Sequence, residues 1–373
     1  QILRDLVAGN VRLVAFMVPE GWRLDQIAAA AESTLAIPAE EFVAAAADSA
    51  LRQELGCRSE TLEAPFVGRD EELRQLKDHF HATTRESRIR VVSVFGPAGI
   101  GKSRLAWEFL KYVDGLAEAV WWHEGRSPAY GDGISFWALG EMVRRRARLQ
   151  EDADEPTTRA AVVAMLEQHV PDPSEREWIE PALLSLLGID ADIASGELLS
   201  AWRTFFERLA ASAPVVMVFE DFHFADAGLL DFIDQMLDWS RSFPIFIFTL
   251  ARPELLERRP DWGAGKRSYT AIHLEPLSME AMRDLLDGLV PGILPSARDA
   301  VIERAEGVPL YAVETVRMLL AQGRVVLEGD AYRPVDDLAD VAVPETLTAL
   351  IGARLDELDA ADRALVADAS VLG

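Results

Sequence analysis

Apolar and polar residues follow one another along the chain in an order that predicts a parallel α/β sheet. Residues 91–95 are largely β-branched and apolar, and a glycine-rich turn follows them. Leu105, Phe109 and Leu110 then lie at spacings typical of one helix face. Because strand, loop and helix in this order open a parallel α/β sheet, this segment predicts the first unit of such a fold.

Two further apolar runs predict the next strands of the same sheet. Residues 215–219 follow an amphipathic helix predicted over residues 197–210, and residues 244–250 follow another over residues 228–239. The run at 244–250 is almost wholly apolar, as expected for a strand that is covered on both faces. The predicted fold class is therefore α/β, with helices flanking a mostly parallel sheet.

Helical patterns occupy much of the remaining chain. Residues 65–80 place acidic side chains in the first turn of a helix with an apolar stripe, and residues 135–190 are helical and rich in acid. Helices are expected again from residue 276 to residue 320, before a polar connection at about 322–342. The first 62 residues combine a short apolar strand with two alanine-rich helices, which predicts a small α/β module.

Length and charge limit the classes of function that the chain can have. Its 373 residues are enough for two or three domains, and no segment reaches the about 18 apolar residues needed to cross a bilayer. The 62 acidic and 37 basic residues give a net charge of −25, which repels phosphate backbones. We therefore expect neither membrane insertion nor direct nucleic-acid binding.

Two smaller features of composition add to this picture. Cys57 is the only cysteine, which excludes an internal disulfide and a multi-cysteine metal site and fits the reducing cytoplasm. The three consecutive arginines at residues 144–146 are interpreted as a solvated helix face.

The glycine-rich turn carries the strongest chemical motif of the chain. It fits the pattern G-x-x-x-x-G-K-[ST] between a predicted strand and a predicted helix, which is the context that this motif requires. Its residues are Gly96, Pro97, Ala98, Gly99, Ile100, Gly101, Lys102 and Ser103. Backbone N–H groups of such a loop bind phosphate oxygens, the lysine reaches the β and γ phosphates, and the serine ligates Mg²⁺. The predicted ligands are ATP or ADP with Mg²⁺.

Acidic and basic residues at two other strand ends complete the candidate site. Glu220 and Asp221 directly follow the apolar run at 215–219, where one carboxylate can hold Mg²⁺ and the other can activate the attacking water. Arg252 follows the third strand and can contact the γ-phosphate, because the carboxyl ends of parallel strands face the ligand. A plain surface position for Arg252 stays an alternative. His223 is interpreted as a hydrogen-bonded residue and not as a metal ligand.

Five stretches together resemble the STAND class of signal-transduction ATPases. They are "FVGRDEEL", "GPAGIGKSR", "VVMVFEDFHFAD", "FTLARPEL" and "EGVPLYAVETVRMLL". The likeness extends over about residues 64–373 and is greatest to bacterial regulators that carry an AAA ATPase module, similar to that of origin recognition proteins, beside a nucleotide cyclase or a LuxR-type DNA-binding domain. Phe224 departs from the pattern, since relatives usually have tryptophan there.

The resemblance implies further residues and a domain division. Val67, Gly68 and Arg69 would lie beside the adenine, Arg104 would join the nucleotide site, and Pro309 would close over the nucleotide from a helical domain. The implied domains are a P-loop ATPase domain at 64–272, a helical lid at 273–325, a linker at 326–342 and the truncated start of a winged-helix domain at 343–373.

The same resemblance implies a function. Members of this class use ATP as a slowly hydrolysed switch that controls a signalling or transcription output, with possible ATP-dependent oligomers and protein partners in the cytoplasm. The output domain, a nucleotide cyclase or a DNA-binding domain, would lie outside this chain. An autonomous P-loop enzyme, an AAA+ machine and a nucleotide-stabilised interaction protein remain alternatives.

Residues 11–62 resemble a different family, the N-terminal part of endolytic murein transglycosylases. None of the catalytic region of that family follows, so the resemblance implies a gene fusion or an assembly join and no transglycosylase activity. A helix-rich adaptor module is the alternative interpretation.

Overall fold

A computed structural model of the chain describes residues 64–128, 136–150, 153–189, 195–328 and 331–335, together with Pro38 and Gly352. The chain divides into two compact units, residues 1–62 and 63–373, and the description below concerns the second. The predicted N-terminal module at 1–62 and the predicted winged-helix start at 343–373 lie outside the described residues, apart from Pro38 and Gly352.

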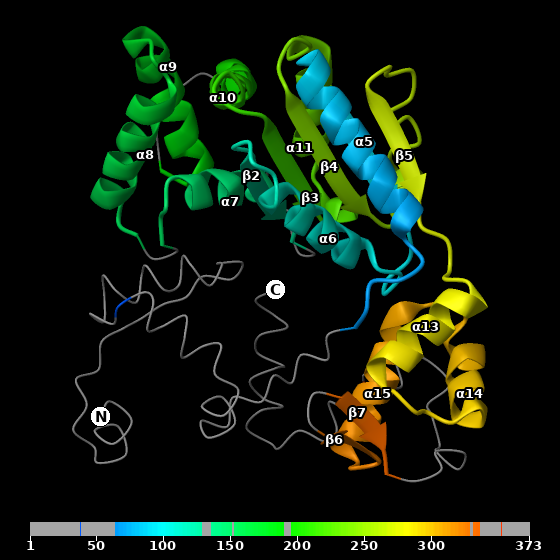
Figure 1. The fold of residues 1–373 in the computed structure, drawn as a ribbon. Coiled ribbons are helices and arrows are strands. Elements are labelled where there is room, and N and C mark those ends of the chain that lie inside the picture. Colours follow the sequence, from blue (N-terminus) through cyan, green and yellow to red (C-terminus); the bar gives the residue numbers. More distant parts are fainter. Residues whose placement is uncertain are drawn as a thin grey trace, which may run out of the picture. The chain divides into compact units, whose positions relative to one another are not determined.

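A parallel sheet of five strands forms the centre of this unit, which confirms the predicted fold class (Figure 1). Its strands lie in the order β2-β3-β4-β1-β5, and all neighbouring pairs are parallel. The strands are β1 (Arg90–Phe95), β2 (Trp121–Arg126), β3 (Val215–Glu220), β4 (Ile245–Ala251) and β5 (Tyr269–His273).

Side chains of the central strands alternate between two buried layers. Val92 and Val94 of β1 pack with α5 (Asp70–Glu86) and α6 (Lys102–Asp114). Val91 and Phe95 point the other way, into a larger apolar cluster. Helices on that side are α7 (Trp137–Arg146), α8 (Glu155–His169), α9 (Pro173–Leu186), α10 (Ser195–Ala210), α11 (Ala227–Trp239) and the short α12 (Glu254–Arg258).

The two edge strands are the ones that the apolar pattern did not predict. β2 reads WWHEGR and β5 reads YTAIH, and each buries only part of its residues. An edge strand pairs on one side only and is less enclosed, so it accepts polar residues that a central strand does not.

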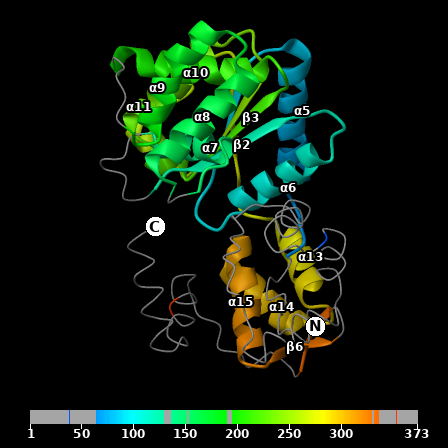
Figure 2. The ribbon, with the colours of Figure 1, turned by 90° about the vertical axis from the view of Figure 1, so that its left-hand side faces the viewer.

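A helical part follows the sheet, with α13 (Met279–Leu289), α14 (Pro295–Ala305) and α15 (Pro309–Ala321) (Figures 1 and 2). Strands β6 (Val325–Glu328) and β7 (Ala331–Pro334) then form an antiparallel pair. The sequence predicted a linker at 326–342, and the structure has this hairpin there instead. Side chains of a strand alternate between its two faces, so a short strand pair can bury one face, as it does at Val325.

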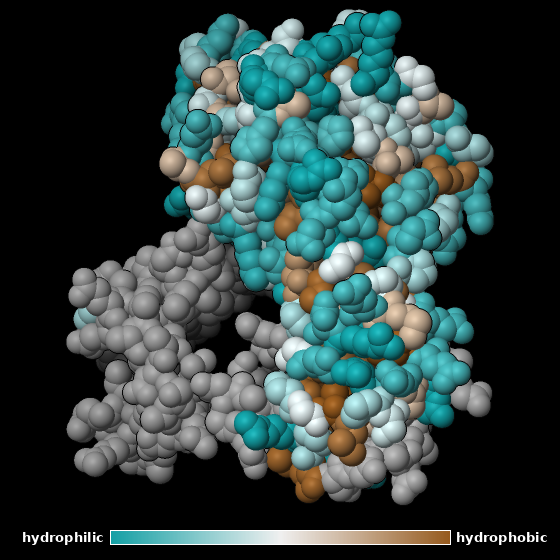
Figure 3. Space-filling view, turned by 45° about the vertical axis from the view of Figure 1, so that its right-hand side comes forward, coloured by the Kyte–Doolittle hydropathy of each residue, from teal (hydrophilic) through white to brown (hydrophobic). Residues whose placement is uncertain are grey.

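One face of the described part of the chain is mostly polar. Figure 3 shows a mostly hydrophilic face, with apolar side chains in separate spots and not in one continuous area. Within the described ranges, none of the helices has the length and apolar character to span a bilayer.

Candidate nucleotide-binding site

The phosphate loop lies between β1 and α6, as the motif predicts. Gly99 and Gly101 have φ angles of 76° and 106°, in the left-handed region where a β-carbon is strained. α6 begins at Lys102, so the N–H groups of its first turn are free of intrahelical partners and close to the loop. Pro97 and Ala98 are exposed, which leaves one side of the loop open to a ligand.

Two cations lie near each other beside this loop. Lys102 Nζ donates to the carbonyl oxygens of Gly96 and Pro97, at 2.8 and 2.9 Å. Burial lowers the pKa of Lys102, and the charge of Arg252 lowers it further. Neither cation forms an ion pair with a carboxylate among the described residues. A phosphate group would relieve this repulsion, so the residues present fit a phosphorylated ligand.

Register explains how Arg252 reaches the loop. Phe95 of β1 pairs with Ala251 of β4, so both strands end at the same height in the sheet. The loop follows Phe95 directly and Arg252 follows Ala251 directly. The sheet therefore brings Lys102 and Arg252 together, although they are 150 positions apart in the chain.

The hydroxyl of Ser103 and the carboxylate of Glu220 form a second pair at this edge. Burial raises the pKa of Glu220 and nearby Glu124 raises it further, whereas a hydrogen bond from Ser103 lowers it. Hydroxyl and carboxylate oxygens are ligands that Mg²⁺ prefers. No cluster of three or more histidine, cysteine, aspartate or glutamate side chains could hold a metal in the described ranges. A Mg²⁺ ion bound by Ser103 and Glu220 would thus take its remaining ligands from phosphate and water, and it would neutralise phosphate charge.

Asp221 lies one residue beyond the end of β3, whereas Glu220 is the last residue of that strand. β3 ends at Glu220, and Asp221 has a φ of 47° at the start of the short 3₁₀ helix η1 (Phe222–Phe224). The two acidic side chains therefore diverge at a tight turn and not through the pleat of a strand. Arg126 Nε donates to Asp221 Oδ2 at 2.7 Å, so this carboxylate is occupied by an ion pair.

Sequence reasoning missed Arg126 because it missed β2. Arg126 ends this edge strand and lies in register with Glu220, so its position follows from the pairing of β2 with β3. A polar run after the tryptophan pair at 121–122 is the only local signal of the strand end.

The turn after Asp221 is held by another arginine. Arg258 of α12 donates to the carbonyl oxygens of His223 and Ala225, the latter at 3.1 Å.

The interpretation of His223 as a hydrogen-bonded side chain is wrong, because neither ring nitrogen has a partner in the described part of the chain. Burial lowers the pKa of His223, and the charge of Arg252 lowers it further.

The segment expected near the adenine packs against both the loop and the helical part. Arg69 is only 6% exposed, and its guanidinium donates to the carbonyl oxygens of Ile100 and Glu275, at 3.3 and 2.5 Å. A β-carbon on Gly68 would lie 2.7 Å from Cβ of Ala281 in α13. Val67 is partly buried beside them. The arginine therefore ties the phosphate loop to the chain that leads into the helical part.

The first turn of α15 contacts the phosphate loop directly. The backbone N–H of Leu310, next to Pro309, donates to the carbonyl oxygen of Gly99 at 3.2 Å. A β-carbon on Gly99 would lie 2.9 Å from Cβ of Leu310. Arg104, by contrast, is turned along α6 and pairs with Glu108 at 2.9 Å.

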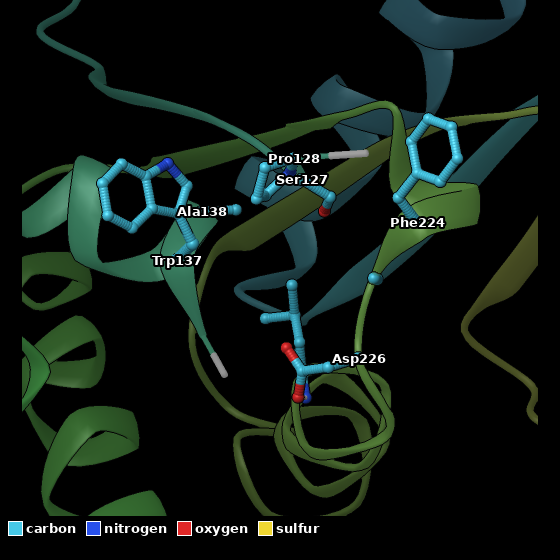
Figure 4. Close-up of a pocket in the computed structure, with 8 residues that line it drawn as sticks. Ser127, Pro128, Trp137, Ala138, Phe224 and Asp226 are labelled. Carbon is cyan, nitrogen blue, oxygen red and sulfur yellow. Dashed lines mark hydrogen bonds between the residues drawn. The ribbon is translucent and has the colours of Figure 1, made fainter. Parts of the chain in front are cut away.

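A shallow recess lies beside the acidic turn. Figure 4 shows Trp137 and Phe224 on opposite sides of it, with Ser127 between them and Asp226 below. Asp226 caps α11 by accepting from the N–H of Leu229 at 3.1 Å. None of the lining residues belongs to the phosphate loop, so the recess and the phosphate site are separate features.

The fold and this loop define a P-loop nucleotide-binding protein. A family model described as an AAA ATPase domain matches residues 65–248. The chain therefore carries a P-loop ATPase module of the AAA type. No curated protein sequence matches it significantly.

Comparison with solved structures finds partial matches of low sequence identity to this chain. The Orc1 protein of Aeropyrum pernix in complex with DNA is 14% identical, with a TM-score of 0.46 over 80% of this chain and 67% of that one. A STAND protein with a tetratricopeptide repeat sensor from Pyrococcus horikoshii is 16% identical, with a TM-score of 0.43 over 80% of this chain and 34% of that one. Cdc6p from Pyrobaculum aerophilum is 12% identical, with a TM-score of 0.45 over 72% of this chain and 67% of that one.

Proposed function

We propose that this protein is an ATP-dependent regulatory switch of the STAND type. The observation that carries the proposal is the contact between α15 and the phosphate loop, where the Leu310 N–H meets the Gly99 carbonyl. A ligand that rearranges the loop must also act on this contact. Nucleotide state at the loop thus sets whether the helical part stays docked, which is how one phosphate group biases a two-state element.

The proposed roles of the charged residues follow from their places. Lys102 and Arg252 bind the terminal phosphates, and Ser103 with Glu220 holds Mg²⁺. Asp221 accepts the proton of the attacking water as the new bond to phosphorus forms and the bond to the leaving ADP breaks. Because Arg126 occupies Asp221 at 2.7 Å, the proton acceptor must first leave an ion pair, which supports slow hydrolysis.

The output of the switch is proposed from the sequence resemblance alone. A nucleotide cyclase or a DNA-binding domain would receive the signal in the cytoplasm, and the ATP form would be the extended or assembled one. Adenine contacts of Val67, Gly68 and Arg69, and closure by Pro309, belong to the same proposal.

Calorimetric titration and small-angle scattering test this function together. We expect saturable binding of both ATP and ADP with Mg²⁺, turnover of ATP slower than about one per second, and a larger radius of gyration with ATP. Binding of neither nucleotide would refute the site. Identical scattering with ATP and ADP would refute the switch, and fast turnover would favour an autonomous enzyme.

A further inference from the structure

A half-buried arginine that has no carboxylate partner among the described residues packs on the edge strand β2. Arg146, the last residue of α7, places its guanidinium carbon 4.4 Å from the centre of the Trp121 ring. Its Nε donates to Nε2 of the buried His123 at 3.2 Å. The solvated face predicted for residues 144–146 is therefore wrong at Arg146, because the side chain packs on the strand.

Further arginines surround Arg146 in the sequence, and the charge of one of them, Arg148, acts on it. Arg144 and Arg148 form no ion pair within the described ranges, and only Arg145 does, with Glu141 at 3.6 Å. Burial and, to a smaller extent, the charge of Arg148 together lower the pKa of Arg146 to about 10. In a chain of net charge −25, a half-buried guanidinium without a carboxylate is a costly arrangement.

The contacts with His123 and Trp121 fix the orientation of the Arg146 guanidinium, whose two terminal NH₂ groups form a fork. Nε is bound to His123 and one face lies on Trp121, so the two terminal NH₂ groups have no partner in the described part of the chain. The ring of His169 lies edge-on to the ring of Trp121, with the ring centres 5.2 Å apart. Burial lowers the pKa of His169, and the charge of Arg146 lowers it further. Trp121 is itself held by Ser212, which accepts from its indole N–H at 2.9 Å.

We propose that Arg146, with His169 and Arg148 beside it, is a binding site for a carboxylate group. A fork of two NH₂ groups held in one plane matches the two oxygens of a carboxylate, and stacking on an aromatic ring favours arginine in this role. Trp121 is the first residue of β2 and Arg126, which pairs with Asp221, is the last. The site therefore lies roughly 15 Å along the strand from the acidic turn. It is distinct from the nucleotide site.

Side-chain NMR of the full chain, labelled in its histidines and free of nucleotide, tests this proposal. Titration with succinate at constant ionic strength should shift the His169 signal saturably, with a dissociation constant of roughly millimolar order. Arg146→Met should weaken binding at least about tenfold, since the fork is lost. Arg85→Met, which removes an exposed arginine from the last turn of α5, should leave it unchanged.

Other ligands and variants sharpen the result. Arg146→Lys keeps the charge without the fork and should also bind at least about fivefold more weakly, which preserves the test if the methionine variant does not fold. Tighter binding of an aspartate-rich peptide than of succinate would identify a protein as the source of the carboxylate, and equal binding a small molecule. Equal shifts with chloride, preferential binding of inorganic phosphate, or unchanged affinity in both Arg146 variants would overturn the proposal.

Discussion

At the scale of single residues, repulsion between Lys102 and Arg252 marks where a phosphate is expected to bind. Among the described residues, the ammonium group of Lys102 donates only to the backbone carbonyl oxygens of Gly96 and Pro97. Lys102→Ala should therefore weaken ATP binding by about 1.5–3 kcal/mol, the value of a hydrogen bond to a charged group, and leave unfolding unchanged. Lys111→Ala on the exposed side of the same helix is the matched control. Equal calorimetric affinities of the two variants would contradict this role.

Asp221 allows a second residue-scale prediction. Asparagine tolerates the left-handed backbone at this position and keeps the shape of the side chain, but it cannot accept a proton. Asp221→Asn should bind ATP as the wild type does and hydrolyse it about 10²–10⁴-fold more slowly, as measured by phosphate release.

Asp226→Asn is the control for this variant. Asparagine is as good a helix cap as aspartate, so α11 should be intact and hydrolysis unchanged. If Asp226→Asn slows hydrolysis as much as Asp221→Asn does, the effect comes from the turn and Asp221 is not the proton acceptor.

The buried His123 predicts how stability changes with pH. Burial lowers its pKa to about 3, from 6.5 in an unfolded chain. Between these values the unfolded state binds one more proton than the folded state, so stability is lost as pH falls. This residue alone should reduce the free energy of unfolding by about 1.4 kcal/mol for each pH unit below 6.

Denaturant unfolding of His123→Gln at pH 7, 6 and 5 checks this value. Glutamine can still accept from Arg146, and the variant should show a smaller loss of stability on acidification than the wild type. His81→Gln, at an exposed position, should keep the wild-type slope. Parallel slopes for the wild type and His123→Gln would show that the ring is not the source of the acid sensitivity.

At the scale of elements, the segment before α13 and the segment before α15 approach each other closely through their backbones. Gly307 has a φ of 76°, its carbonyl accepts from the Leu277 N–H at 2.8 Å, and a β-carbon on it would lie 2.7 Å from the Leu277 oxygen. Gly292 has a similar φ of 88° but open space around it. Both alanine variants carry the left-handed strain, and only Gly307→Ala adds a clash with backbone.

Gly307→Ala should therefore lower the free energy of unfolding by about 1–3 kcal/mol more than Gly292→Ala does. Urea denaturation followed by circular dichroism measures the difference. If the two variants lose the same stability, the contact between Gly307 and Leu277 does not hold the helices together.

Elements also differ in how far the sequence predicted them. The central strands β1, β3 and β4 are mostly apolar and were predicted, because burial on both faces favours apolar residues. Their two buried hydroxyl groups satisfy each other, since Thr249 donates to Ser93 at 2.7 Å. β2 and β5 were not, since edge strands carry residues such as His123 and Glu124. The acidic pair was predicted by its place after β3, but Arg126 required the pairing of β2 with β3, which no local pattern contains.

At the scale of the whole molecule, two contacts join the ATPase core to the helical part. Arg69 ties the phosphate loop to the chain before α13, and Leu310 ties the loop to α15. Both contacts involve backbone carbonyls of the loop itself, at Ile100 and Gly99. A change at the loop therefore reaches the helical part at two points, which is the physical basis of the proposed switch.

Amide exchange at Leu310 tests this account most directly. Leu310 is the second residue of α15, where an N–H has no intrahelical acceptor, so its protection reports the bond to Gly99. Hydrogen–deuterium exchange should be at least about tenfold faster with a non-hydrolysable ATP analogue than with ADP, a population shift of about 1.4 kcal/mol. Equal protection of Leu310 in both nucleotides, with both bound at saturation, would contradict the central claim that the nucleotide controls the docking of α15.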